Sequence, residues 1–103
     1  MYRQQLHMQI VLGKYRDFYD ILVALNDELK RKGLKQIELW APATGAEMNT
    51  VVLVTDFESL AQWDEDNRKF QTDPEVMKIW RSGAAFVDGR PREELWQTAY
   101  EIA

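Results

Sequence analysis

The order of the predicted elements is the feature that most constrains this chain: strand, helix, two strands, a helical region and a final strand, over 103 residues. A βαββαβ order in a chain this short predicts an α+β, ferredoxin-like fold, in which a four-stranded antiparallel sheet carries its helices on one face. The opposite face, called the open face from here on, has no element left to cover it. What covers the open face therefore decides what kind of protein this is.

The boundaries of the elements follow from hydrophobic periodicity, with steps of two in the strands and of three and four in the helices. The strands are predicted over about Gln5 to Leu12, Lys35 to Ala41, Met48 to Thr55 and Glu93 to Ile102. The helices are predicted over about Lys14 to Lys32, from the capping residue Ser59 to about Gln71, and from a restart at Thr72-Asp73-Pro74-Glu75. Short connections predict a hairpin at Pro42 to Ala46 and a turn at Asp88 to Pro91.

Composition limits the class of protein. With 46% hydrophobic residues, the chain predicts a single domain over residues 1–103 with a packed core. It has no cysteine, which excludes disulfides and thiolate sites, and one histidine among scattered carboxylates does not predict a metal site. A net charge of −4 argues against a nucleic-acid surface, and so does the size of the nearest basic cluster, which has only Arg81, Arg90 and Arg92. No segment has the length of a membrane span or the pattern of a signal peptide, so we expect a cytoplasmic protein without a membrane partner.

Alternation along the strands assigns side chains to the two faces of the sheet. The first strand is predicted to direct Leu6, Met8, Ile10 and Leu12 toward the helices and His7, Gln9 and Val11 to the open face. With the strand order 4-1-3-2, the open face also receives Glu38, Trp40, Trp96, Thr98 and Tyr100. The helical region is predicted to face inward with Leu60, Trp63, Asn67 and Phe70, and to build core with Trp63, Phe70 and Trp80. An open face that is both aromatic and polar is typical of an interface or a ligand cavity.

Three classes of protein that share this element order are excluded by their residues. An RNA-recognition module would carry stacking aromatic residues on the third strand, whereas Asn49 to Thr55 contains none. A ferredoxin or a soft-metal carrier would need cysteines. A glycine-rich phosphate loop is excluded because the five glycines are isolated from one another.

Three segments carry a resemblance to a known family: Leu6 to Leu12 leading into the helix of Tyr15 and Phe18, the run Asp56-Phe57-Glu58-Ser59-Leu60, and the restart before Val76 to Trp80. In these segments the chain resembles the dimeric α+β barrel superfamily, and within it most closely the NIPSNAP-like group. The resemblance implies a homodimer whose two sheets pair through their open faces and enclose a pocket. Relatives in the superfamily include antibiotic biosynthesis monooxygenases, small isomerases and haem-degrading enzymes. The haem-degrading branch uses a histidine on a helix, whereas His7 lies on a strand, so we expect no haem.

Two hypotheses about function follow. In the first, the dimer is a small-molecule-binding or interaction module, and Trp40, Trp96 and Tyr100 pack its interface. This reading is favoured because the sequence shows no convergent set of acid, base and nucleophile. In both hypotheses the partner is a second copy and the ligand is a small aromatic or apolar molecule, bound without a cofactor or a metal.

In the second hypothesis the protein is a cofactor-independent monooxygenase or isomerase acting on a small, flat, apolar substrate. His7 is then the base, because a histidine has an ordinary pKa of about 6.5. Gln9, Glu38 and Tyr100 would orient the substrate or stabilise charge. Trp40 and Trp96 would exclude water.

Overall fold

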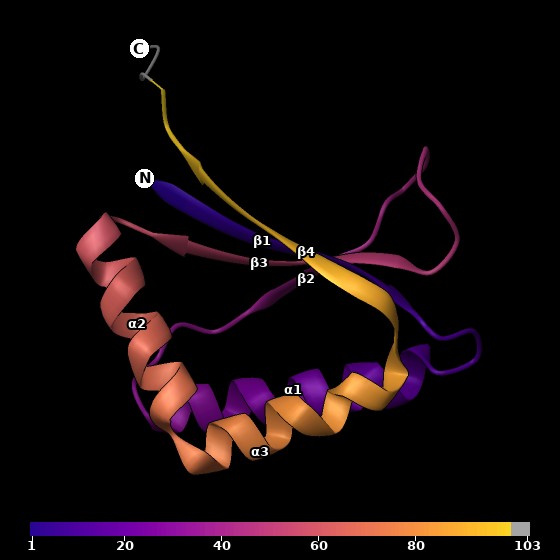
Figure 1. Cartoon of the computed structure of the whole chain (residues 1–103), viewed down its shortest axis with the longest axis horizontal. Helices are drawn as coiled ribbons and strands as arrows, with labels where there is room; N and C mark the ends of the chain where they lie inside the picture. Colours follow the sequence, from indigo (N-terminus) through magenta and orange to yellow (C-terminus); the bar gives the residue numbers. More distant parts are fainter. Residues whose placement is uncertain (100–103) are drawn as a thin grey trace.

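Four antiparallel strands form one sheet, and the helices lie on one of its faces (Figure 1). The computed structural model describes residues 1–99. Its elements, in chain order, are β1 (Tyr2–Ile10), α1 (Tyr15–Arg31), β2 (Glu38–Trp40), β3 (Thr50–Phe57), α2 (Leu60–Thr72), α3 (Pro74–Ser82), the 3-10 turn η1 (Gly83–Phe86) and β4 (Val87–Gln97). The strand order is β2-β3-β1-β4, with antiparallel pairing throughout. The predicted α+β, ferredoxin-like fold and its strand order are confirmed.

The core lies between α1 and the two central strands. Phe18, Leu22, Leu25 and Leu29 recur at three- and four-residue steps along α1, so they form one apolar stripe, and all four are buried. The sheet contributes buried side chains from β1 and β3, and α3 contributes Val76: the residues are Met8, Ile10, Val51, Leu53 and Val76. Burial of this stripe on one face of the sheet leaves the other face without helical cover.

The helices begin and end where their capping residues allow. The hydroxyl of Ser59 accepts the backbone N–H of Gln62 at 3.0 Å, which fixes the start of α2. The carboxylate of Asp73 accepts the N–H groups of Glu75 and Val76, and Pro74 occupies the first turn of α3. The two helices therefore meet at a sharp corner. The predicted helix restart is confirmed.

The α2 helix stands away from the sheet (Figure 1). It has no buried residue, although the sequence predicts an inward face on it. The prediction that Leu60 faces inward is wrong, since its side chain is 50% exposed at the first turn. Trp63, Phe70 and Trp80 are half-buried, with Phe70 and Trp80 at the margin of the core. The space left beneath α2 is what creates the candidate site described below.

Several predicted strand boundaries are wrong. The first strand ends at Ile10, and Leu12 is 75% exposed in the turn before α1 instead of lying under the helices. The second strand has only three residues, because the backbone N–H and C=O of Ile37 bond the side-chain amide of Asn26 on α1 at 2.7 and 2.8 Å. The third strand extends to Phe57, which pairs with Tyr2.

The predicted turn at Asp88 to Pro91 is part of β4 and forms a bulge. From His7 to Gln9, β1 covers two residues, whereas the paired segment of β4, which runs back from Arg92 to Asp88, covers four. Gly89 adopts a φ of 77°, which an L side chain rarely tolerates, and proline has no N–H to give to a ladder. The extra residues bend β4 without changing which face its later side chains occupy.

Across residues 1–99, no helix combines the length and the hydrophobicity that crossing a lipid bilayer requires. The single-domain boundary and the cytoplasmic location stay predictions.

Candidate functional site

The strand register places five of the six predicted site residues on the open face. His7 is opposite Val52 of β3, which is opposite Trp40 of β2, and side chains directly opposite one another share a face. By the same register, the predicted site residues Gln9, Glu38 and Trp96 also lie on this face. Tyr100 lies outside the described residues. The role of these side chains in catalysis or ligand binding stays a prediction.

His7 lies among polar groups on the open face. Its Nε2 is 3.0 Å from Oε1 of Gln5 and 3.6 Å from Oε1 of Glu94. Glu94 also accepts a hydrogen bond from Trp96 Nε1 at 2.9 Å and one from Arg92 Nε at 2.8 Å, and these donors hold the pKa of Glu94 below its ordinary value. His7 therefore has a carboxylate neighbour, as a base would need, on a surface without helical cover.

Trp40 and Trp96 are 51% and 58% exposed, and they lie on the two edge strands. Gln9 donates from its side-chain amide to the carboxylate of Glu47, in the loop between β2 and β3. Among residues 1–99, the predicted site residues do not line the cavity that lies on the opposite face of the sheet, between the sheet and the helices α2 and α3.

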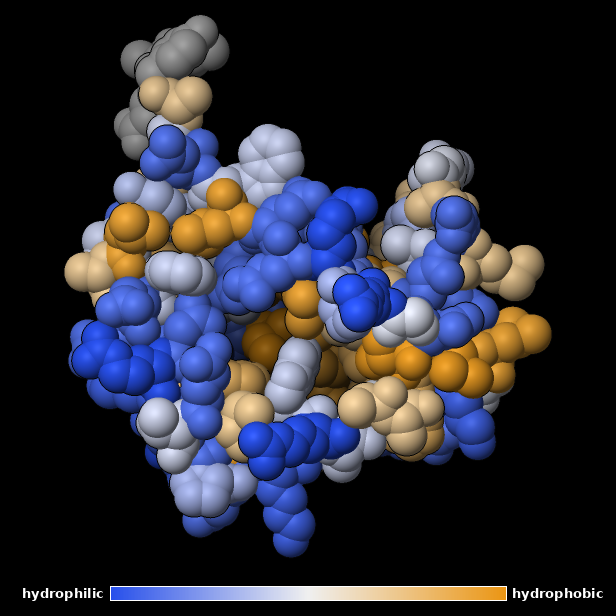
Figure 2. Space-filling model, viewed as in Figure 1, coloured by the Kyte–Doolittle hydropathy of each residue, from blue (hydrophilic) through white to orange (hydrophobic). Residues whose placement is uncertain are grey.

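A cavity of about 460 Å³ lies on the helix side, between α2, α3 and the sheet. Figure 2 shows it as a hollow with hydrophobic residues at its bottom and hydrophilic residues along its upper and left sides. Its lining residues come from β1, the segment before β2, β3, α2, α3 and β4. They are Gln4, Leu6, Lys35, Ile37, Leu53, Thr55, Phe57, Asp66, Asn67, Phe70, Gln71, Met77, Trp80, Arg81 and Glu93. The volume is within the usual range of small-molecule sites, about 300–1,000 Å³.

The apolar part of the lining suits a flat molecule. Leu6 and Leu53 come from neighbouring positions on β1 and β3, so they form a continuous floor. Phe70 of α2 and Trp80 of α3 meet edge to face, with ring centroids 5.7 Å apart and an interplanar angle of 79°. Such an aromatic corner fixes the position of both rings. A planar apolar ligand can lie against the floor and this corner at the same time.

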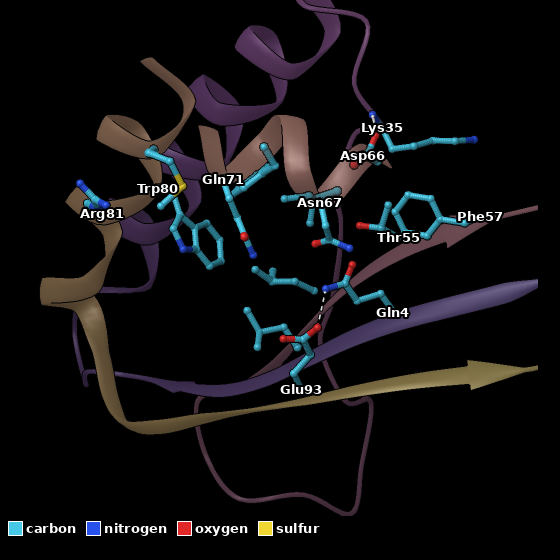
Figure 3. A pocket seen from close by; sticks show the side chains of 15 residues that line it. Gln4, Lys35, Thr55, Phe57, Asp66, Asn67, Gln71, Trp80, Arg81 and Glu93 are labelled. Atoms are coloured by element: carbon cyan, nitrogen blue, oxygen red, sulfur yellow. Dashed lines mark hydrogen bonds between the residues drawn. The ribbon is translucent and has the colours of Figure 1, made fainter. Parts of the chain in front are cut away.

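The polar part of the lining converges on the middle of the cavity (Figure 3). The side-chain amides of Gln4, Asn67 and Gln71 come from β1 and α2 and point toward one another, with Glu93 of β4 beneath them. Gln4 Nε2 donates to Glu93 Oε1 at 2.9 Å, and Asn67 Nδ2 donates to the backbone C=O of Trp63 at 3.0 Å. Amide groups both donate and accept hydrogen bonds, so the cavity can recognise carbonyl or hydroxyl groups on a ligand.

Charged groups lie toward the ends of the cavity. Asp66 accepts the backbone N–H of Lys35 at 3.0 Å, which closes one end between α2 and the segment before β2. Arg81 of α3 lies at the other end (Figure 3). Among residues 1–99, no three His, Asp or Glu side chains gather as metal ligands would.

The sequence did not predict this cavity as a site, although four of its lining residues were predicted as helix-facing, inward or core positions: Leu6, Asn67, Phe70 and Trp80. The sequence does contain a signal for this cavity, which is the presence of polar residues at strand positions on the helix face of the sheet. By the strand register, Gln4, Thr55 and Glu93 lie on the same face of the sheet as Leu6 and Leu53. Gln4 and Thr55 are half-buried there, and Glu93 is exposed on the edge strand β4. Polar groups at such positions are costly unless they are paired or serve a site.

Comparison with known proteins finds similarity in three-dimensional structure and none in sequence. No protein-family model matches this chain, and no curated protein matches it in sequence. An uncharacterised NIPSNAP domain protein from Burkholderia xenovorans superposes with a TM-score of 0.80 at 13% identity, covering 100% of this chain and 99% of that chain. The fold is NIPSNAP-like.

Two further solved structures share this NIPSNAP-like fold. A NIPSNAP family protein of unknown function from Agrobacterium tumefaciens has a TM-score of 0.76 at 14% identity, over 96% of this chain and 88% of that chain. A putative antibiotic biosynthesis monooxygenase from Nitrosomonas europaea has a TM-score of 0.70 at 13% identity, over 97% and 100%. The predicted resemblance is confirmed at the level of fold, and a shared fold does not choose among activities.

Proposed function

We propose that this NIPSNAP-like domain binds a small, flat, largely apolar molecule in the cavity between α2, α3 and the sheet. The observation that carries the proposal is the cavity itself, about 460 Å³ in volume, with an aromatic corner and converging amides. The rings of the ligand lie against Phe70 and Trp80. Its oxygen atoms bond the amides of Asn67 and Gln71, and no cofactor is needed for binding.

Ligand binding is tested by thermal unfolding with 1-tetralone and 2-naphthol, two fused-ring molecules that carry one oxygen each. A ligand at ten times its Kd stabilises the folded state by about 1.4 kcal/mol, which raises the Tm by several degrees in a domain of this size. Gln71→Trp fills the cavity with an indole ring and should abolish the rise.

Arg68→Trp is the matched control, because Arg68 projects from α2 into solvent with its side chain 69% exposed. It should keep the ligand-induced rise in Tm. Equal shifts in the two variants, or no shift in the parent protein with either compound, would contradict the proposed site.

We propose further that two copies associate through their open faces. The folded chain exposes 7364 Å², against about 6,000 Å² for a compact monomer of this size. A stable interface covers about 800 Å² on each partner, which is within that excess. The open face offers two exposed tryptophans, a residue type enriched at interface centres. In the dimer, Trp40 and Trp96 are the apolar contacts, and His7, Gln9 and Glu38 are polar contacts.

The association is tested by light scattering over a range of concentrations. Trp40→Glu places a charge on the open face and should weaken self-association at least about 10-fold, because a buried unpaired charge is costly. Leu60→Glu is the matched control, with similar exposure at 50% but a position on α2. A monomer at every concentration, or equal weakening by both variants, would rule out the open-face dimer.

The alternative function keeps His7 as the base of a cofactor-independent enzyme. It is favoured by the carboxylate of Glu94, 3.6 Å from Nε2, which can orient an imidazole for proton transfer. The substrate would then lie between the two open faces. This alternative makes activity dependent on association, so Trp40→Glu would abolish turnover together with the dimer.

A further inference from the structure

Glu93 is the carboxylate that lies closest to the converging amides of the cavity. It faces the helices from β4, opposite Leu6 of β1. Its Oε1 accepts the hydrogen bond from Gln4 Nε2 at 2.9 Å, and Figure 3 shows the carboxylate directed into the cavity below that amide. Asp66, the other carboxylate of the lining, instead accepts the backbone N–H of Lys35 at one end. Glu93 is therefore the lining carboxylate placed to meet the middle of a bound ligand.

The amides around Glu93 provide donors for a negative charge. Each side-chain amide carries two N–H bonds. Asn67 uses one donor on the backbone C=O of Trp63 and so retains an N–H for a ligand, whereas Gln4 directs its donor to Glu93. Gln71 points into the same space (Figure 3). Fixed donors aimed at an oxygen stabilise charge that develops on it during a reaction.

We propose that the cavity catalyses proton transfer on a flat ketone, with Glu93 as the catalytic base. A carboxylate oxygen of Glu93 takes a proton from the carbon next to the carbonyl. The C–H bond breaks, an O–H bond forms on Glu93, and the electron pair moves to the carbonyl oxygen to give an enolate. The amides of Asn67 and Gln71 donate to that oxygen.

The second half of the reaction returns the proton. The O–H bond of Glu93 breaks, and the proton joins the same carbon or, in a β,γ-unsaturated ketone, the γ carbon two positions further on, which moves the C=C bond into conjugation with the carbonyl. The first outcome is exchange with solvent and the second is an isomerisation. Neither outcome needs an oxidant, a reductant or a cofactor. This inference rests on the proposed ligand site and adds the reaction and its base.

Gln4 acts as a positioning residue in this scheme. Its hydrogen bond occupies Oε1 of Glu93 and so directs Oε2 toward the ligand. Gln4→Leu should lower the rate of exchange at saturating ketone and leave the Kd of the ketone unchanged. If Gln4→Leu lowered the exchange rate only by changing the packing of the cavity, the Kd of the ketone would rise instead.

The reaction is tested by following deuterium uptake next to the carbonyl of 1-tetralone in D₂O by NMR. The parent protein should accelerate uptake above the buffer rate, and Glu93→Gln should lose at least about 100-fold of that acceleration, the usual minimum for a general base. Glu65→Gln is the matched control, since Glu65 pairs with Lys69 on the exposed side of α2, outside the cavity lining, with its side chain 65% exposed. It should keep the acceleration.

Binding measured on the same samples separates this inference from the proposed function. If 1-tetralone binds but exchanges at the buffer rate, or if Glu93→Gln exchanges as fast as the parent, the base assignment is overturned and the ligand site stands. If neither 1-tetralone nor 2-naphthol binds, both are overturned. Retained binding with lost exchange in Glu93→Gln supports both.

Discussion

At the scale of single residues, the best-formed contact of the open face is the ion pair of Arg3 and Asp56. Arg3 Nε and Nη2 donate to the two carboxylate oxygens of Asp56 at 2.8 and 2.9 Å, a bidentate geometry that makes such pairs strong. The side chain of Asp56 is 27% exposed. The hydrogen bond from Arg3, and after it the charge of Arg3, hold the pKa of Asp56 below its ordinary value.

The lowered pKa of Asp56 predicts part of the acid sensitivity of the fold. A carboxyl whose pKa is lower in the folded than in the unfolded state stabilises the fold above its unfolded pKa, near 4, and loses that contribution as pH falls through its folded pKa. Asp56→Asn should therefore flatten the fall in unfolding free energy below about pH 4. Urea unfolding from pH 7 to pH 3 measures the slope.

The control for this acid effect is Asp64→Asn, because Asp64 pairs with Arg68 on the exposed side of α2. It should leave the slope close to that of the parent protein. Identical slopes for the parent and Asp56→Asn would show that the Arg3 pair contributes nothing to acid stability.

At the scale of elements, periodicity and capping residues were enough to predict the architecture. The stripe of α1 and the alternation of β1 each have one buried face, so their residues predict both the type of element and its orientation. Asp73 and Pro74 predicted the corner between α2 and α3, because a capping side chain followed by proline marks the start of a helix. These elements are predictable because each depends on interactions within a few residues.

Features that depend on a distant segment were not predictable. The short β2 results from Asn26, eleven residues earlier, taking the hydrogen bonds of Ile37. The β4 bulge results from its register against β1, which no local pattern records. The cavity exists because α2 stands off the sheet while Phe70 and Trp80 hold its far end against α3. Sequence reasoning therefore placed the site on the open face and missed the space under α2.

The α2 helix, with no buried residue, depends strongly on its capping interactions. Ser59→Ala removes the hydroxyl that accepts the N–H of Gln62 and should lower the free energy of unfolding by about 1 kcal/mol. Ser59→Asp keeps an acceptor at the cap and should stay close to the parent protein. Chemical denaturation measures both. Equal stability of the parent and Ser59→Ala would mean that other contacts hold the start of α2.

At the scale of the whole molecule, the fold is more extended than its length requires. The radius of gyration is 14.3 Å, against about 13 Å for a compact domain of 100 residues. The core occupies only the helix side of the sheet, whereas the open face carries ion pairs and exposed tryptophans. The two faces therefore suit different tasks. We propose that the helix side binds a ligand and that the open face meets a second copy.

The most direct test of this account is a titration of 2-naphthol into isotope-labelled protein, followed by the side-chain N–H signals in NMR spectra. Ligand in the cavity should move the amide signals of Asn67 and Gln71 and the indole signal of Trp80, and leave the indole of Trp40 unchanged. The contradictory result is movement of the Trp40 and Trp96 indoles with those three signals unmoved, which would return the ligand site to the open face.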